Sequence, residues 1–252
     1  MAEQPHNQTD SQGRKQGYWE ETGKWGKIEK GHYVDGLRQG AWQIYREDGV
    51  TLGSEGNYLN GERQGLWKSY YDDGILREEG PYHNGQQHGL WKVYHEDGVT
   101  LYVEGHYLKG DKHGVWKYHH SDGVTLRQET PYLNGQLHGL WKEYYPDGVT
   151  LRQETPYLKG EVHGIWKTYY EDGVTLKEET EHFDKGDPLI FEYNKDGTIR
   201  RAYYSAEENE EHTYISQGEI EVYNKVIFSV GRETWKAIPR ELFDYLTHIE
   251  IL

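Results

Sequence analysis

The sequence predicts an all-β protein, an elongated array of stacked antiparallel β-hairpins that ends in a small mixed β/α cap. Three observations predict this class. Tryptophan recurs about every 25 residues, at positions 42, 67, 91, 116, 141 and 166. An Asp-Gly pair follows each of these tryptophans, and such pairs favour tight turns. Tyr and Trp account for 32 of the 252 residues, whereas Leu, Ile, Val and Phe account for only 48. Aromatic side chains must therefore supply the core.

One full copy of the repeat shows how each hairpin is expected to form. Residues 140–145 are rich in aromatic residues and are predicted to be the first strand. Asp147 and Gly148 are expected to make a two-residue turn, and residues 149–157 return as the second strand. Residues 158–164 then form a wider connection to the next hairpin. Two turns within 25 residues, with no apolar stripe at helical spacing, exclude a helix.

The repeat divides the chain into three segments. Residues 1–16 are expected to be a flexible N-terminus. Residues 17–197 contain one partial, six full and one degenerate copy of the repeat. Residues 198–252 are unique and are predicted to form a cap, with two strands within 214–230 and a short helix over 238–248.

Alternation along the first strand of each copy separates two faces. The tryptophans are expected to form a packing ladder on one face. The other face carries a column of tyrosines and a column of lysines, and tyrosine is enriched at protein interfaces. These columns are expected either to contact a partner or to serve only in packing. The expected contact residues are Tyr45, Tyr70, Tyr94, His119, Tyr144, Tyr169, Lys92, Lys117 and Lys142. A recurring glutamate column would form either a solvated face or an acidic stripe, at Glu55, Glu79, Glu104, Glu129, Glu154 and Glu179.

The periodic polar residues do not indicate catalysis or metal binding. Successive histidines of one column would lie ~10 Å apart, too far to share a zinc ion, at His88, His113, His138 and His163. Aspartate before glycine suits a turn. No copy assembles an acid, a base and a pocket, so we expect no enzyme activity, no cofactor and no metal. The absence of cysteine excludes disulfides and cysteine-ligated metals.

The net charge of −15 constrains the partner. Binding to nucleic-acid phosphates or to an anionic membrane surface requires basic protein surface, so neither is expected. An acidic chain favours a basic protein partner. The N-terminal residues lack the apolar stretch of a signal peptide, and no segment approaches ~18 apolar residues, which predicts a cytoplasmic protein. The sequence does not define an oligomeric state.

The pattern Tyr-x-Asn/Lys-Gly-x-x-His-Gly-x-Trp-x-x-Tyr-Tyr-x-Asp-Gly resembles MORN-type repeats, and is most similar to the bacterial variant found in YwqK-type antitoxins. The resemblance covers roughly residues 17–197. It implies a long twisted sheet of stacked hairpins. It also implies a protein-binding module, specifically an antitoxin or immunity protein that occludes a toxin. Two other functions are retained, a structural scaffold and an aromatic array that binds glycans or choline-type groups.

Overall fold

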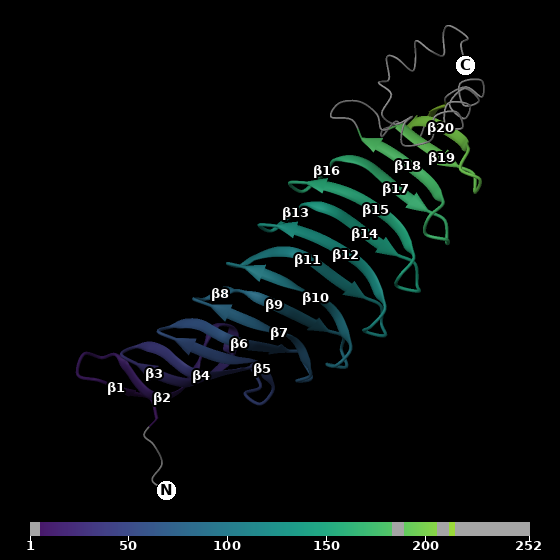
Figure 1. Ribbon diagram of the computed structural model, residues 1–252. Coiled ribbons are helices and arrows are strands. Elements are labelled where there is room, and N and C mark those ends of the chain that lie inside the picture. Colours follow the sequence, from purple (N-terminus) through teal and green to yellow (C-terminus); the bar gives the residue numbers. More distant parts are fainter. Residues whose placement is uncertain (1–5, 183–188, 206–211, 215–252) are drawn as a thin grey trace, which may run out of the picture. The chain divides into compact units, whose positions relative to one another are not determined.

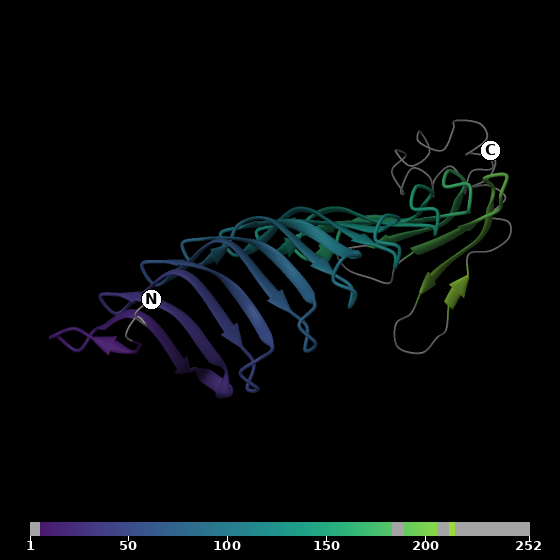
Figure 2. The same ribbon diagram turned by 90° about the horizontal axis from the view of Figure 1, so that it is seen from below.

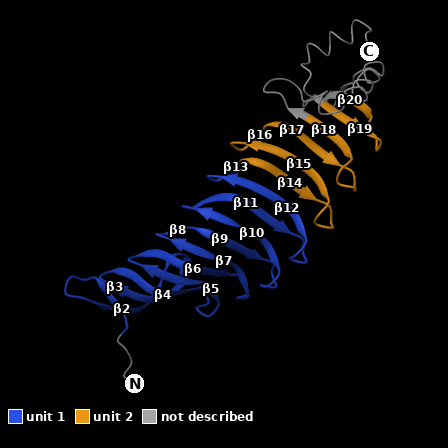
Figure 3. Cartoon of the chain, in the orientation of Figure 1, with its two compact units in different colours: residues 1–137 blue, residues 138–252 orange. Residues whose placement is uncertain are grey.

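The computed structural model describes residues 6–182, 189–205 and 212–214 (Figure 1). The chain divides into two compact units, residues 1–137 and residues 138–252 (Figure 3). In each unit, antiparallel hairpins follow one another in chain order and pair into an open sheet of arched strands (Figure 2). The predicted class, an all-β stack of antiparallel hairpins, is therefore confirmed within each unit.

Unit 1 contains one short 3-10 turn, Lys24–Gly26, and thirteen described strands. Each longer strand pairs antiparallel with its neighbours in the chain. The strands are β1 (Gln8–Thr9), β2 (Lys15–Thr22), β3 (Ile28–Val34), β4 (Leu37–Tyr45), β5 (Leu52–Leu59), β6 (Glu62–Tyr70), β7 (Leu76–His83), β8 (Gln86–Gln87), β9 (Gly89–Tyr94), β10 (Leu101–Leu108), β11 (Asp111–His119), β12 (Leu126–Leu133) and β13 (Gln136–Leu137).

Unit 2 repeats this arrangement and continues it beyond the expected end of the repeats. β20 pairs with β19 and with β21, so the start of the expected cap extends the sheet. The strands predicted within 214–230 and the helix over 238–248 lie outside the described residues, apart from Tyr214. The strands are β14 (Gly139–Tyr144), β15 (Leu151–Leu158), β16 (Glu161–Val162), β17 (Gly164–Tyr169), β18 (Leu176–His182), β19 (Leu189–Tyr193), β20 (Ile199–Ser205) and β21 (His212–Tyr214).

The described part of the N-terminal segment pairs with the first long strand. β1 pairs with β2. The Asn7 side chain also pairs with the outer edge of β2. Its Oδ1 accepts from the Glu20 amide at 3.0 Å, and its Nδ2 donates to the Glu20 carbonyl at 3.2 Å. The amide thus satisfies backbone groups that an edge strand leaves open.

The two connections of each repeat are exchanged relative to the sequence expectation. The two-residue turn is Lys159-Gly160, where both residues have positive φ, 53° and 94°. This is the requirement of a tight hairpin turn. Asp147 and Gly148 instead lie in a six-residue connection, residues 145–150, in which only the glycine has positive φ.

The aspartate of the wide connection holds the turn through its side chain. Asp97 Oδ1 accepts from the amides of Val99 and Thr100 at 3.0 and 2.8 Å, and Oδ2 accepts from the Thr100 hydroxyl. These bonds hold the pKa of Asp97 at about 2. The shortened copy retains only the bond from the Ile75 amide to Asp73, at 2.9 Å. The wide connection therefore needs an acceptor, which explains why aspartate recurs there.

The core of unit 1 is a ladder in which each tryptophan lies over a glycine of the preceding strand. A Cβ atom on any of these glycines would overlap the indole Cδ2 atom. Each indole Nε1 donates at 3.0–3.2 Å to the carbonyl of the residue after the glycine. The tryptophans are 1–4% exposed, which confirms their predicted packing role. The pairs are Gly31–Trp42, Gly56–Trp67, Gly80–Trp91 and Gly105–Trp116.

Tyrosines and cations complete this ladder. A tyrosine ring lies edge-to-face between successive tryptophans, with ring centroids 5.0–6.4 Å apart, from Trp19 to Tyr132. Such contacts favour an aromatic pair beyond the area it buries. Cations lie over the indoles at 4.2–4.6 Å from their centroids, at Lys15, Arg38, Arg63 and Lys112. Aromatic packing thus supplies the core of a sheet poor in aliphatic residues.

Threonine replaces the ladder glycine in the later copies, at Thr130 in unit 1 and Thr155 in unit 2. Thr155 takes the glycine position before Trp166. Trp166 is only half-buried, and its Nε1 has no partner among the described residues. The methyl and hydroxyl groups of threonine are therefore found together with an indole that is less buried and, within the described ranges, lacks the backbone hydrogen bond.

Replacing Gly105 by alanine tests the ladder contact. The new Cβ must displace the Trp116 ring, and overpacking of this kind costs about 1–3 kcal/mol in the free energy of unfolding. Urea denaturation of the full chain measures this loss. The matched control is Thr155→Ala in the same column of unit 2, expected to cost about 1 kcal/mol or less. Equal losses in the two variants would contradict the contact.

The aspartate turns predict an acid-sensitive fold. The pKa values of Asp97 and Asp122 are about 2 in the folded chain, below about 3.9 for an unfolded aspartate. Their contribution to stability is therefore present above pH ~4 and lost as the pH falls towards ~2. Between pH ~4 and ~2, the melting temperature of the double variant Asp97→Asn, Asp122→Asn should fall less than that of the wild type. The melting temperature of the control variant Glu96→Gln should fall as much as that of the wild type. Parallel curves for wild type and double variant would disprove this role.

Candidate functional site

The predicted contact tyrosines lie where the first strand of each repeat ends, on the face opposite the tryptophans. We name this surface the tyrosine–lysine face; it comprises the tyrosine, lysine and glutamate columns of the sequence analysis. In unit 1 its row consists of Tyr45, Tyr70, Tyr94 and His119 at the ends of β4, β6, β9 and β11, and in unit 2 of Tyr144 and Tyr169 at the ends of β14 and β17. All six are half-buried, and they form rows instead of converging on one spot.

The tyrosine hydroxyls are bonded to the glutamate column. Tyr70 Oη donates to Glu55 at 2.7 Å, and Tyr94 Oη donates to Glu79 at 2.9 Å. Burial and the Glu79 carboxylate raise the pKa of Tyr94 to about 12. In unit 2, Tyr169 donates to its glutamate in the same way, at 2.8 Å. These phenols therefore remain neutral donors, and their side chains are half-buried on this face.

The lysine column alternates with the glutamate column across the strands. Glu79 lies opposite Lys68 on one side and Lys92 on the other, and its carboxylate is 3.8 Å from Lys68 Nζ. Lys117 lies between Glu104 and Glu129 in the same way. In unit 2, Glu154 lies opposite both Lys142 and Lys167, and is 3.5 Å from Lys167 Nζ. These glutamates therefore alternate with lysines and do not form a continuous acidic stripe. Glu179, the last of the column, is buried and accepts a hydrogen bond from the Tyr193 hydroxyl at 2.6 Å.

Apolar residues border this charge-balanced row. Leu66, Leu90 and Val115 occupy one column of the face, with 50%, 40% and 48% of their surface exposed. In unit 2, Leu140 continues the column at 41% exposed. Large side chains left half-exposed at every repeat are available to an interacting surface.

His119 is the exception in the tyrosine row. Its Nδ1 lies 3.4 Å from the Val124 carbonyl oxygen, and its Nε2 is buried without a partner among the described residues. It therefore lacks the donation to glutamate that Tyr70 and Tyr94 make.

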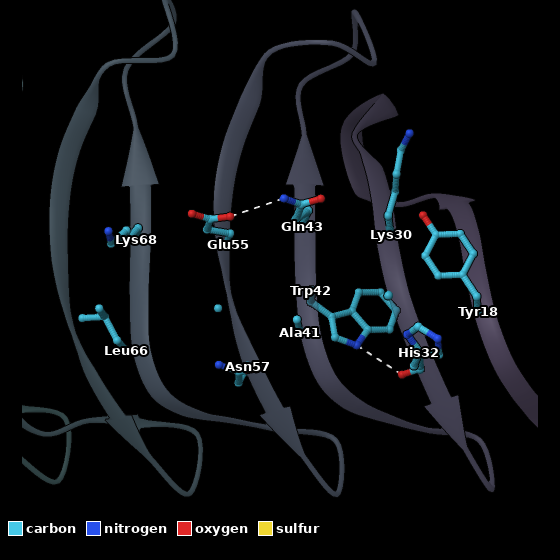
Figure 4. Close-up of a pocket in the computed structure, with 12 residues that line it drawn as sticks. Tyr18, Lys30, His32, Ala41, Trp42, Gln43, Glu55, Asn57, Leu66 and Lys68 are labelled. Carbon is cyan, nitrogen blue, oxygen red and sulfur yellow. Dashed lines mark hydrogen bonds between the residues drawn. The ribbon is translucent and has the colours of Figure 1, made fainter.

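The first full repeat hollows the tyrosine–lysine face. Ala41 replaces the Leu66 of the next repeat, and Gln43 replaces its lysine, which leaves a depression of about 560 Å³ (Figure 4). Gln43 donates to Glu55 at 3.4 Å across it. Tyr18 borders the depression from β2.

Exposed acidic residues lie at the wide connections. Glu47, Asp72 and Glu96 stand there, one residue before the capping aspartates, and Asp72 forms an ion pair with Arg46 at 2.6 Å. Beside them the valines that follow each Asp-Gly pair are 79–82% exposed, at Val50, Val99, Val124, Val149 and Val174. Exposed acidic and apolar side chains thus lie next to one another at these connections.

Comparison with known families identifies the repeat. Four segments match the family described as a MORN repeat variant, at residues 63–84, 87–109, 137–159 and 162–180. These four segments are therefore similar to MORN-type repeats, in agreement with the resemblance. No curated protein matches the chain. Within the described ranges, no helix has the length and apolar character needed to cross a membrane.

Sequence reasoning missed the partners of the tryptophans. A glycine recurs in unit 1 two residues before the first tyrosine of each repeat. Its role becomes clear only when the indole that lies over it is known. The cations over the rings recur with the same period, at Arg38, Arg63 and Lys112, and were equally visible in the sequence. Periodicity could have found both columns, but only the register assigns them to the tryptophan side.

Removing one tyrosine hydroxyl tests the bond between the tyrosine and glutamate columns. Tyr94→Phe leaves Glu79 without its donor and should lower the free energy of unfolding by about 1 kcal/mol. The matched control is Tyr45→Phe, whose hydroxyl donates only to the exposed Gln43 at 3.0 Å, and which should change it by less than about 0.5 kcal/mol. Urea denaturation measures both, and a smaller loss for Tyr94→Phe than for the control would disprove the role of this bond.

Proposed function

We propose that this protein is a non-enzymatic repeat module that binds a basic protein partner along its tyrosine–lysine face, and that it acts as an antitoxin or immunity-type inhibitor. The observation that carries the proposal is the composition of that face. Tyrosine rings and half-exposed Leu and Val recur on it in most copies, and lysines alternate with glutamates between them.

This composition favours a protein partner. Protein interfaces combine aromatic and aliphatic contact area with few uncompensated charges at their centre. Nucleic acid would require a surplus of lysine and arginine on the surface. On the tyrosine–lysine face, however, each lysine of the column lies opposite a glutamate. The tyrosines, held by their hydroxyls, lose little further conformational freedom when a partner covers them.

The charge distribution favours a basic partner. The chain carries −15 net charge, and exposed acidic residues lie along the wide connections, beside the contact face. Such a field accelerates association with a positively charged protein and disfavours acidic competitors. Toxins that degrade nucleic acid have the basic surface this field would attract. A bound inhibitor of this size would act by covering the toxin's working surface, which requires no catalytic group.

A crosslinking and binding experiment tests the proposal. A photoreactive amino acid at Tyr94 of the full chain should capture a basic protein from native lysate. The captured protein, once purified, should bind one-to-one, with an affinity that falls at least about tenfold between 50 and 300 mM salt. Co-expression should suppress the toxicity of that protein.

Matched variants locate the contact. Tyr70→Ala combined with Leu90→Ala should weaken binding by at least about tenfold, because each removes contact area at the face. Gln128→Ala, on the tryptophan side, should leave it unchanged. A partner that binds without salt dependence, a chain that elutes as a long homo-oligomer, or retention on a choline matrix would each contradict the proposal.

A further inference from the structure

A second pocket lies at the wide connections of unit 1, where it adjoins the tyrosine–lysine face at Tyr94. We name it the turn pocket. Its volume is about 530 Å³. It is lined by Tyr71, Tyr94, His95, Glu96, Asp97, Tyr102 and Ser121.

Three residues of the turn pocket depart from their repeat columns. Tyr102 stands where other copies have glycine, arginine or lysine, at Gly53, Arg77, Arg127, Arg152 and Lys177. Ser121 stands where they have an acid or proline, and His95 where most have tyrosine or arginine. These positions are separated by up to 26 residues in the chain, yet they line one pocket. In a chain of near-identical copies, three departures at one place indicate a specific site.

His95 leaves the pocket open. In the preceding copy, Tyr71 Oη donates at 2.7 Å to the Tyr94 carbonyl and so fastens one hairpin to the next. In unit 2, Tyr145 makes the equivalent bond to the Tyr169 carbonyl, at 2.8 Å. The shorter imidazole of His95 makes no such bond. Its Nε2 is buried without a partner among the described residues.

The remaining lining determines the chemistry of the ligand. Tyr102 and His95 lie edge-to-face, 5.2 Å apart, and Tyr71 adds a third ring. Aromatic faces attract cations. Glu96 is exposed and has no ion pair in the described structure, while Asp97 is ionised as it caps its turn. Aromatic rings with carboxylates at the rim suit a positively charged group, either a planar one or one carried on an aliphatic chain.

We propose that the turn pocket binds an arginine or lysine side chain of the protein partner. The proposal rests on the proposed function and adds to it an anchoring point beside the main contact face. The cationic head group would lie against the rings of Tyr102 and His95, with Glu96 at the rim as its counter-charge. The exposed Val99 next to the pocket would contact apolar atoms near that side chain.

A small-molecule titration tests the pocket without the partner. N-acetyl-argininamide should shift the amide NMR signals of Gly98 and Ser121 in the full chain, with a dissociation constant on the order of 10 mM. N-acetyl-citrullinamide has nearly the same shape but no charge, and should shift them at least about tenfold more weakly.

Two variants confine the effect to this pocket. Tyr102→Arg restores the residue of neighbouring copies and places a cation in the pocket, so it should abolish the shifts. His95→Tyr should abolish them by filling the pocket. Arg127→Lys, in the same column one copy later, should bind as the wild type does. Because Arg and Tyr are the residues that other copies carry at these positions, both pocket variants are expected to fold, which circular dichroism checks.

The remaining outcomes either overturn the assignment or separate it from the proposed function. Equal shifts with the citrulline probe, or shifts retained in Tyr102→Arg, would show that the pocket does not select a cation. Tighter binding of tetramethylammonium than of the arginine probe would assign it to a small quaternary amine instead of a protein side chain. If the probe fails while a partner still binds the tyrosine–lysine face, only this inference is lost. If the probe binds but no basic partner is captured, only the proposed function is lost.

Discussion

The contact between each tryptophan and the glycine of the preceding strand is the constraint on which the rest of unit 1 depends. A single-layer sheet has no second layer under which to bury large side chains, so each indole must lie flat on its own sheet. That placement requires a residue without Cβ directly below the ring, as at Gly56 and Gly105. The indole Nε1 then reaches a backbone carbonyl, and the tyrosine and cation columns fill the space between successive rings.

Because the tryptophans form the core on one side of the sheet, the tyrosine–lysine face on the other side does not have to supply it. That face needs only to remain ordered, which the bonds from tyrosine to glutamate and the alternation of lysine with glutamate achieve. Side chains that are held in place yet only half-buried can contact a macromolecule with little loss of conformational entropy. The same division places exposed acidic residues at the turns, where they influence approach more than packing.

The repeat class, the two faces and the burial of the tryptophans could all be predicted, because periodicity and alternation are properties of the sequence alone. The assignment of the turns could not. Asp147-Gly148 and Lys159-Gly160 both resemble tight turns, and only the backbone shows that the aspartate serves as a hydrogen-bond acceptor while the lysine adopts positive φ. The turn pocket was hidden for a similar reason. His95, Tyr102 and Ser121 are minor departures when read along the chain, and become a site only when the register brings them together.

The alternation of lysine and glutamate has a consequence for how such a chain can change in length. Each copy brings its own tryptophan and its own pair of opposite charges, so adding or deleting a whole 25-residue copy leaves the ladder and its charge balance intact. Length is therefore free to drift by duplication, and the extent of the contact face drifts with it. The copy that contains Tyr102 is different, because its loss would remove a feature that no neighbour can replace. Recognition in this architecture thus has an adjustable part, set by the number of copies, and a fixed part, set by one irregular copy.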